Sequence, residues 1–216
     1  MLRLDEFLPD DWSAEPRNVR TYEHSMTVAN AARLVASRIA ALDPEKAYMY
    51  GMMHDVGKFY LPANEAYKHP RIGFKLLETK HNDIAEICVS HAFPDFSDLE
   101  HILSYCHGDK PEAHAVCELL SNIKHDLYID LIQFCDKVSG IGTYMTIEAK
   151  YDWYIERDIM IQNDVTLRYL ETLQSIKKKL DKLVGYDLYA LIGASQNSKE
   201  PVRKKVHVDG RGCSLQ

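Results

Sequence analysis

Apolar residues recur at steps of three and four along most of this 216-residue chain, and this spacing constrains the fold more than any other feature. From His24 onward, Val28 and Val35 lie on one face of a predicted helix that extends to about residue 41. No segment shows the alternation expected of a half-buried strand. The sequence therefore predicts an all-α, single-domain helical bundle, with further helices beginning near Pro44, Pro70, Ile84, residue 112, Leu127 and residue 159.

Some helix ends are predicted by single residues. Asp43 is an expected N-cap, because Pro44 follows it at the first helical position. Gly57 is expected to end the helix that begins there, and "LPANEAY" is expected to be a connecting loop. The stripe over residues 159–184 has the spacing of a short coiled-coil seam, but packing against the domain's own core is the preferred interpretation.

The expected domain covers residues 1–193. Its motif-bearing core lies at about residues 15–150, and C-terminal helices follow at about 152–193. Apolar residues become scarce after that point, so residues 194–216 are expected to be a flexible tail.

Composition excludes some classes of protein. The net charge of −6 argues against general nucleic-acid binding. No run approaches the roughly 18 to 20 apolar residues that a membrane span needs. The acidic start "MLRLDEFLPDDW" does not resemble a signal peptide, and five cysteines without a C-x-x-C pair are typical of reduced thiols. We therefore expect a cytoplasmic protein.

Several histidines and aspartates lie on faces that the apolar spacing predicts to be buried. His24, His54, His91 and Asp136 are each in register with the inner side of their own helix. One such histidine could be an ordinary hydrogen-bonded core residue. Several on separate helices are different, because burying polar groups is costly unless they are bonded. Imidazole nitrogens and carboxylate oxygens that converge in a helical bundle are typical of a divalent metal site.

The adjacent pair His54–Asp55 suits such a site. Neighbouring helical residues point about 100° apart, so both side chains could approach one ion. Asp55 could instead direct one oxygen to each of two ions. Gly57 would allow a sharp turn, and Lys58 lies about one turn on, where its ammonium group could contact a phosphate oxygen.

The ordered set of "YEHSMTVA", "HDVGK" and "FCDKVSG" resembles the HD-domain metal-dependent phosphohydrolase superfamily over roughly residues 15–150. By this resemblance the protein has an HD-type helical fold. "HPRIG" and "CVSHAF" are similar to motifs of the branches that hold two ions, and the spacing through His91 is nearest to the bacterial symmetrical dinucleoside tetraphosphatase branch. The resemblance implies a first ion on His24, His54, Asp55 and Asp136. It also implies that Asp55 bridges to a second ion on His69 and His91.

The expected activity is hydrolysis of a phosphate ester or anhydride, in a nucleotide or dinucleotide, by metal-activated water. Asp55 and Lys58 are the expected catalytic residues. Two divalent ions are expected, with iron or manganese foremost and magnesium, nickel, zinc or cobalt as alternatives. The candidate substrate-binding residues are Lys58, Arg20, Arg71 and His107.

Two other functions are compatible with the same residues. One is a one-metal nucleotidase that uses His24, His54, Asp55 and Asp136 alone. The other is a module that senses a nucleotide without cleaving it. In each case the partner is a phosphorylated small molecule, and a homo-oligomer is compatible with the sequence.

Overall fold

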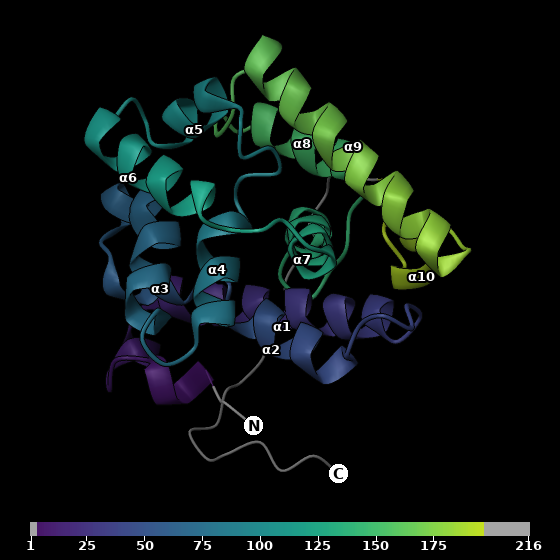
Figure 1. Ribbon diagram of the computed structural model, residues 1–216, viewed down its shortest axis with the longest axis horizontal. Helices are drawn as coiled ribbons and strands as arrows, with labels where there is room; N and C mark the ends of the chain where they lie inside the picture. The colour runs from purple at the N-terminus through teal and green to yellow at the C-terminus, as the bar shows by residue number, and fades with distance from the viewer. Residues whose placement is uncertain (1–3, 197–216) are drawn as a thin grey trace.

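The computed structural model describes residues 4–196, which form ten α-helices and four short 3-10 helices, labelled η (Figure 1). This confirms the predicted all-α, single-domain fold, since the described residues contain two isolated β-bridges and no strand. None of these helices is both long and apolar enough to span a membrane. In chain order the elements are η1 Leu4–Phe7, η2 Trp12–Ala14, α1 Pro16–Ala36, α2 Pro44–Met53, η3 Val56–Tyr60, η4 Ala63–Lys68, α3 His69–Leu77, α4 Asn82–Ser90, α5 Leu99–Tyr105, α6 Lys110–Ser121, α7 Leu127–Val138, α8 Ile147–Ile155, α9 Asp164–Val184 and α10 Leu188–Ile192.

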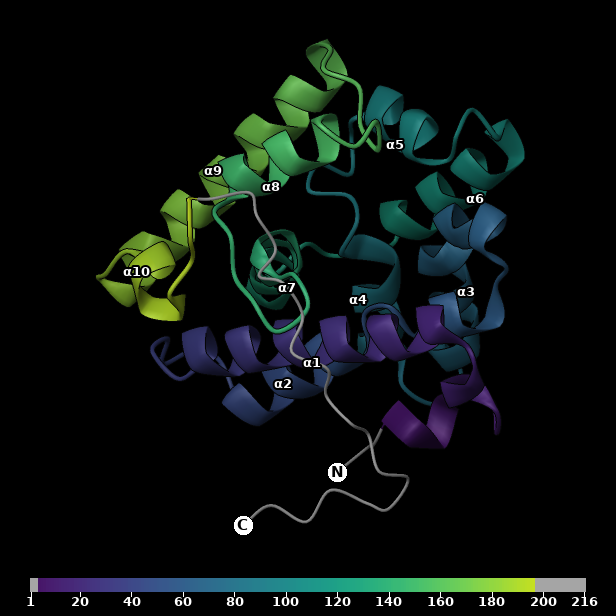
Figure 2. The same cartoon turned by 180° about the vertical axis from the view of Figure 1, so that it is seen from behind.

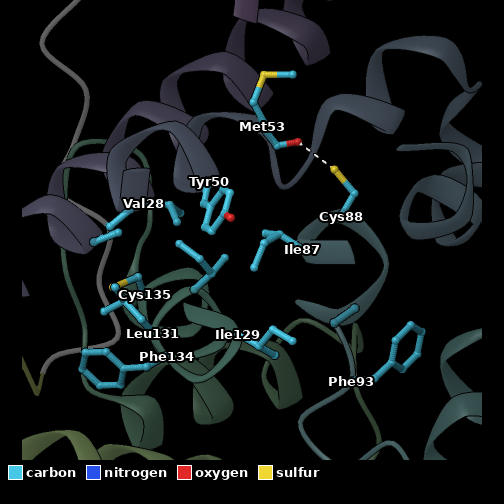
Figure 3. Packing of buried hydrophobic residues seen from close by; sticks show 14 of the residues in the cluster. Val28, Tyr50, Met53, Ile87, Cys88, Phe93, Ile129, Leu131, Phe134 and Cys135 are labelled. Atoms are coloured by element: carbon cyan, nitrogen blue, oxygen red, sulfur yellow. Dashed lines mark hydrogen bonds between the residues drawn. The ribbon is translucent and has the colours of Figure 1, made fainter. Parts of the chain in front are cut away.

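Helix α7 lies at the centre of the molecule. Figures 1 and 2 show it nearly end-on, with α1 and α2 on one side and α8 and α9 on the other. Its apolar residues are almost inaccessible to solvent, among them Leu131, Phe134 and Cys135. In Figure 3 these side chains lie in the same core as Val28 of α1 and Ile87 of α4. Because α7 is enclosed on all sides, its polar residue Asp136 is carried into the interior.

Helices α1 and α2 approach each other very closely at Gly51. A Cβ atom added to Gly51 would lie 2.5 Å from the Ala29 Cα atom, so no larger residue fits between these backbones. A second contact joins α2 to α4, where the Cys88 thiol donates a hydrogen bond to the Met53 carbonyl oxygen at 3.3 Å (Figure 3). These contacts bring the end of α2 against both α1 and α4.

The structure confirms the predicted helix start at Asp43, whose side chain accepts hydrogen bonds from the amides of Glu45 and Lys46. The prediction for Gly57 was wrong. Helix α2 ends at Met53, and Gly57 lies within η3 without a positive φ. Glycine is needed there for close approach, because an added Cβ would lie 2.2 Å from the His69 carbonyl oxygen.

Other boundaries also differ from the predicted ones. Helix α1 starts at Pro16 and ends at Ala36, before the expected residue 41. Most of the expected loop 61–67 is the 3-10 helix η4. Helix α9 starts at Asp164 rather than at 159, because Asn163 and Thr166 form a capping box.

The C-terminal helices pack on the core. Helix α8 begins at Ile147, before the expected residue 152. The apolar stripe of α9 packs against the protein's own core from Tyr169 to Leu180, as interpreted, while Leu183 at its end is exposed. The amide of Ser195 donates to the Tyr144 carbonyl, and the Ser195 carbonyl accepts from the Thr146 amide. Residues 197–216 of the expected tail lie outside the described residues.

Candidate metal centre

Six histidine and aspartate side chains from five helical segments meet inside the core. Four of these side chains are almost inaccessible to solvent: His54, Asp55, His69 and His91. We call the six residues the ligand cluster: His24 in α1, His54 and Asp55 directly after α2, His69 at the start of α3, His91 directly after α4, and Asp136 in α7.

One half of the cluster is formed by α1, α2 and α7. The Nε2 atom of His24 lies 2.9 Å from Oδ1 of Asp136, and Nε2 of His54 lies 3.7 Å from the same oxygen. Oδ2 of Asp55 faces this group, at 3.5 Å from His54 and 4.0 Å from His24. Four side chains therefore direct nitrogen or oxygen atoms to one place.

The other oxygen of Asp55 faces a second pair of histidines. Its Oδ1 atom lies 3.0 Å from Nε2 of His69 and 3.5 Å from Nε2 of His91. The two histidine Nε2 atoms are 3.1 Å apart. Asp55 thus divides its two carboxylate oxygens between two groups of imidazoles.

Local backbone geometry fixes the orientation of three of these rings. The Nδ1 atoms of His54, His69 and His91 bond to the carbonyl oxygens three residues earlier, at 2.7, 2.7 and 2.8 Å. A carbonyl oxygen can only accept, so each Nδ1 carries the proton. Each Nε2 is then left with a lone pair. This arrangement is typical of metal-binding histidines, whose second nitrogen is held by an outer partner.

Whether a cation fits the ligand cluster depends on how many of its nitrogen and oxygen lone pairs lack a hydrogen-bond donor. The Nε2 atoms of His69 and His91 face each other as acceptors, so neither satisfies the other. Within residues 4–196, Nε2 of His54 and Oδ1 of Asp55 are buried without a hydrogen-bond partner. Two triads in this range have ligand atoms within 4.8 Å of one another: His24, His54 and Asp136, and His54, Asp55 and His91. A divalent cation fits this set of donors.

Charge within the cluster also favours ligation. Burial and the charge of Lys58 lower the pKa of His69 to about 3, and burial lowers the pKa of His91. For Asp55, burial favours the neutral acid. The charge of Lys58 and the nearby histidines outweigh this effect and hold the pKa of Asp55 well below its usual range. Neutral imidazole and ionised carboxylate are the forms that bind metal.

His54 differs from its neighbours. Burial lowers the pKa of His54, but the negative charges of Asp55 and Asp136 outweigh burial and raise it. Two carboxylates therefore favour positive charge at this ring, and a cation bound there would meet the same attraction.

Each carboxylate of the cluster also forms an ion pair with a lysine. Nζ of Lys58 lies 2.5 Å from Oδ2 of Asp55, and Nζ of Lys137 lies 2.6 Å from Oδ2 of Asp136. Burial disfavours the charged form of Lys137, yet the charge of Asp136 keeps its pKa well above the usual value. Sequence reasoning singled out Lys58 but missed Lys137. The available signal was its position directly after Asp136 in "FCDKVSG".

The other candidate substrate-binding residues lie elsewhere in the described structure. Arg71 donates hydrogen bonds to both oxygens of Glu112, at 2.7 to 2.9 Å. Arg20 is exposed on α1. His107 is exposed in the left-handed backbone region and stacks on Tyr67 at 5.0 Å. Among residues 4–196, no hydrogen bond or ion pair joins these three to the ligand cluster.

The sequence was also compared with models of known protein families. A family model described as HD domain matches residues 21–141, more than half of the chain. The chain belongs to the HD domain family. Its members are generally metal-dependent hydrolases, and they bind divalent metals. Comparison with curated proteins and with solved structures finds no match.

The HD domain of this chain contains all six residues of the ligand cluster, together with Lys58 and Lys137. The predicted resemblance to the superfamily is confirmed. The match does not support the narrower resemblance to the dinucleoside tetraphosphatase branch. Helices α8, α9 and α10 lie outside the matched residues.

Proposed function

We propose that this HD-domain protein hydrolyses a phosphate ester or anhydride of a nucleotide or dinucleotide at the ligand cluster. One observation carries the proposal. The Nδ1 atoms of three cluster histidines bond to carbonyl oxygens, so their Nε2 lone pairs, like the carboxylate oxygens, point into one buried space. Buried acceptors that face one another are costly without a cation. Family membership supports the same conclusion, since HD domains are generally metal-dependent hydrolases.

We propose that the cluster holds two ions. His24, His54 and Asp136 would bind the first with one oxygen of Asp55. His69 and His91 would bind the second with the other oxygen. The division of the Asp55 oxygens supports this arrangement, because each faces a different pair of imidazoles. Mixed nitrogen and oxygen ligands suit iron or manganese, and other divalent ions remain alternatives for the metal assay.

If bound at the ligand cluster, divalent ions would supply the polarisation of phosphoryl oxygens and a bound water of lowered pKa as the nucleophile. The residues of the chain provide position and charge. The carbonyl bonds to His54, His69 and His91 fix the imidazole orientation. Lys58 lies at the edge of the cluster with its side chain 30% exposed, so its ammonium group can donate to a phosphate oxygen. Asp55 is the residue on which both halves of the site depend.

The first prediction concerns Asp55. The Asp55→Ala variant should lose metal-dependent phosphatase activity while its helix content, measured by circular dichroism, stays unchanged. Activity should be assayed with manganese or ferrous iron against mono-, di- and oligophosphate nucleotides. Asp83→Ala is a matched control, because Asp83 is a half-exposed aspartate that pairs with Lys46, away from the cluster. Full activity in Asp55→Ala would refute the proposed mechanism.

Two further readouts separate the alternatives. Elemental analysis under saturating, oxygen-free conditions should give two ions per chain, and a single ion would favour the one-metal nucleotidase. Absence of turnover across the whole panel, with a nucleotide still raising the melting temperature, would favour the sensing module instead.

A further inference from the structure

Gln133 of α7 carries a buried amide group that connects α7 to the end of α4. Its side chain is inaccessible to solvent, and its Nε2 atom donates hydrogen bonds to the carbonyl oxygens of Ser90 and Phe93, at 2.9 and 3.0 Å. Figures 1 and 2 show α4 beside α7, so these bonds cross the interface between two packed helices. Both hydrogens of the amide group are thus used on one short segment of backbone.

Packing alone does not explain an amide at this position. A carbonyl oxygen can only accept, so the two carbonyl partners fix the orientation of the Gln133 amide. Its Oε1 atom is then left buried without a hydrogen-bond partner among residues 4–196. An unbonded buried oxygen is costly, and an apolar side chain would fill a similar space without that cost. What glutamine adds here is therefore its pair of donated bonds.

The segment that Gln133 holds contains the metal-ligand candidate His91. Helix α4 ends at Ser90, and the Phe93 amide donates to the Ser90 carbonyl oxygen at 3.0 Å, so residues 90–93 form a tight turn. His91 lies inside this turn, between the two carbonyl groups that Gln133 binds. The position of the turn relative to α7 therefore determines where the His91 ring and its Nε2 atom lie.

The same helix also carries a ligand of the other half of the cluster. Gln133 lies three residues before Asp136, so the two side chains share a face of α7. Asp136 belongs to the half that includes His24, whereas His91 belongs to the half that includes His69. Helix α7 thus supplies a ligand atom to the first half and an anchor to the second.

We infer that Gln133 is a positioning residue for the second ion, because it holds the turn at residues 90–93 where Nε2 of His91 faces Asp55 and His69. The inference rests on the two-ion version of the proposed function. Residues that orient a metal ligand from outside typically contribute about 10- to 100-fold to metal affinity. Gln133 should contribute an amount of this order to the second ion and nothing to the first.

Calorimetric titration of the full chain with manganese, in the absence of substrate, tests this role. Gln133→Met has a similar side-chain volume and lacks both donors. We expect it to weaken the second ion by about 10- to 100-fold and to leave the affinity for the first ion unchanged. The ion that it weakens should be the one that His91→Ala loses, because Gln133 acts through His91.

Hydrogen exchange in the presence of a chelator gives a second readout that requires no metal. The His91 amide donates to the Ile87 carbonyl oxygen, and the Phe93 amide donates to the Ser90 carbonyl oxygen. Both amides should exchange about tenfold faster in Gln133→Met than in the wild type, because the turn is no longer held from α7. Unchanged exchange at both amides would contradict the inference.

Two controls separate positioning from a general loss of stability. Gln174→Met is matched in chemistry, because Gln174 is exposed on α9 and bonds to Glu148 at 2.8 Å. Ile176→Val removes one methylene from the core side of α9, and it should leave both manganese affinities unchanged.

The manganese titration distinguishes this inference from the function on which it rests. Two ions bound with wild-type affinity in Gln133→Met would overturn the role of Gln133 and leave the two-ion site standing. Equal weakening of both ions would also overturn it, since Gln133 would then be a structural residue only. A wild type that binds a single ion would refute the two-ion site and this role together.

Discussion

At the scale of single residues, each of the two carboxylates in the ligand cluster contacts both a histidine and a lysine. Asp55 faces His69 and His91 with one oxygen, and contacts Lys58 with the other. Asp136 is divided in the same way between His24 and Lys137. The two lysines are therefore the positive charges nearest to any phosphate bound at the cluster.

Lys58→Met should lower kcat/KM by about 10- to 100-fold with manganese saturating. The reason is the loss of a charge-assisted hydrogen bond to phosphate, which contributes about 1.5 to 3 kcal/mol. Steady-state kinetics measure the change, and Lys58→Arg should retain part of the activity. Lys75→Met is the control, because Lys75 is exposed and forms its ion pair with Glu78, a residue outside the ligand cluster. Unchanged kinetics in Lys58→Met would remove Lys58 from the site.

His101 makes the free energy of unfolding depend on pH. Burial lowers its pKa to about 4, against 6.5 for an ordinary histidine. Between these values the unfolded chain binds the extra proton, so stability falls as the pH decreases from about 6.5 to about 4. Each pH unit costs about 1.4 kcal/mol.

Urea unfolding at pH 7.5 and pH 4.5 tests this expectation. The loss of stability between the two pH values should be about 2 to 3 kcal/mol smaller in His101→Leu than in the wild type. His114→Leu should behave like the wild type, because the His114 side chain is 75% exposed. An equal acid sensitivity in His101→Leu would contradict the assignment.

At the scale of helical elements, three histidines of the cluster lie at helix ends. His54 and His91 directly follow α2 and α4, and His69 begins α3. Each ring bonds back to a carbonyl oxygen of the preceding turn. The position of the helix end thus determines where Nε2 points.

Gly57→Ala should destabilise the protein by about 1 to 3 kcal/mol and weaken binding of the second ion. Its Cβ would lie 2.2 Å from the His69 carbonyl oxygen and 2.7 Å from the Gly73 amide nitrogen, so η3 and α3 must separate. Urea unfolding and manganese titration measure the two effects. Gly51→Ala is the counterpart, because it should separate α1 from α2 and disturb the His24 half. Wild-type metal binding in Gly57→Ala would contradict the argument.

Helical spacing was sufficient to predict that His24, His54, His91 and Asp136 face inward, because the period of a helix fixes which residues share a face. The close approach that requires Gly57 was not predictable, since it depends on how η3 packs against α3.

Partners that are distant in the sequence were not predictable either. Arg71 was expected near phosphate, but Glu112 of α6, 41 residues away, binds it. Lys137 lies beside residues of α8 and α9, and these two helices carry no recognisable motif.

At the scale of the whole molecule, the ligand cluster lies where several helices that pack around one apolar core come together. Its residues come from α1, the ends of α2 and α4, the start of α3, and the central α7. An ion bound there would link both sides of the core.

Metal removal should therefore lower the melting temperature. Binding at 1,000 times the dissociation constant stabilises the folded state by about 4 kcal/mol, which corresponds to about 10 °C for a chain of this length. Calorimetry with manganese and with a chelator measures the shift. Asp55→Ala should melt at the same temperature in both conditions. Equal melting temperatures for the wild type would contradict a metal site in the core.

The pairing of Lys58 with Asp55 and of Lys137 with Asp136 has a consequence for how the protein matures. Burying either acid beside an ammonium group costs less free energy than burying it as an isolated charge. We therefore expect the chain to be able to fold before it binds ions.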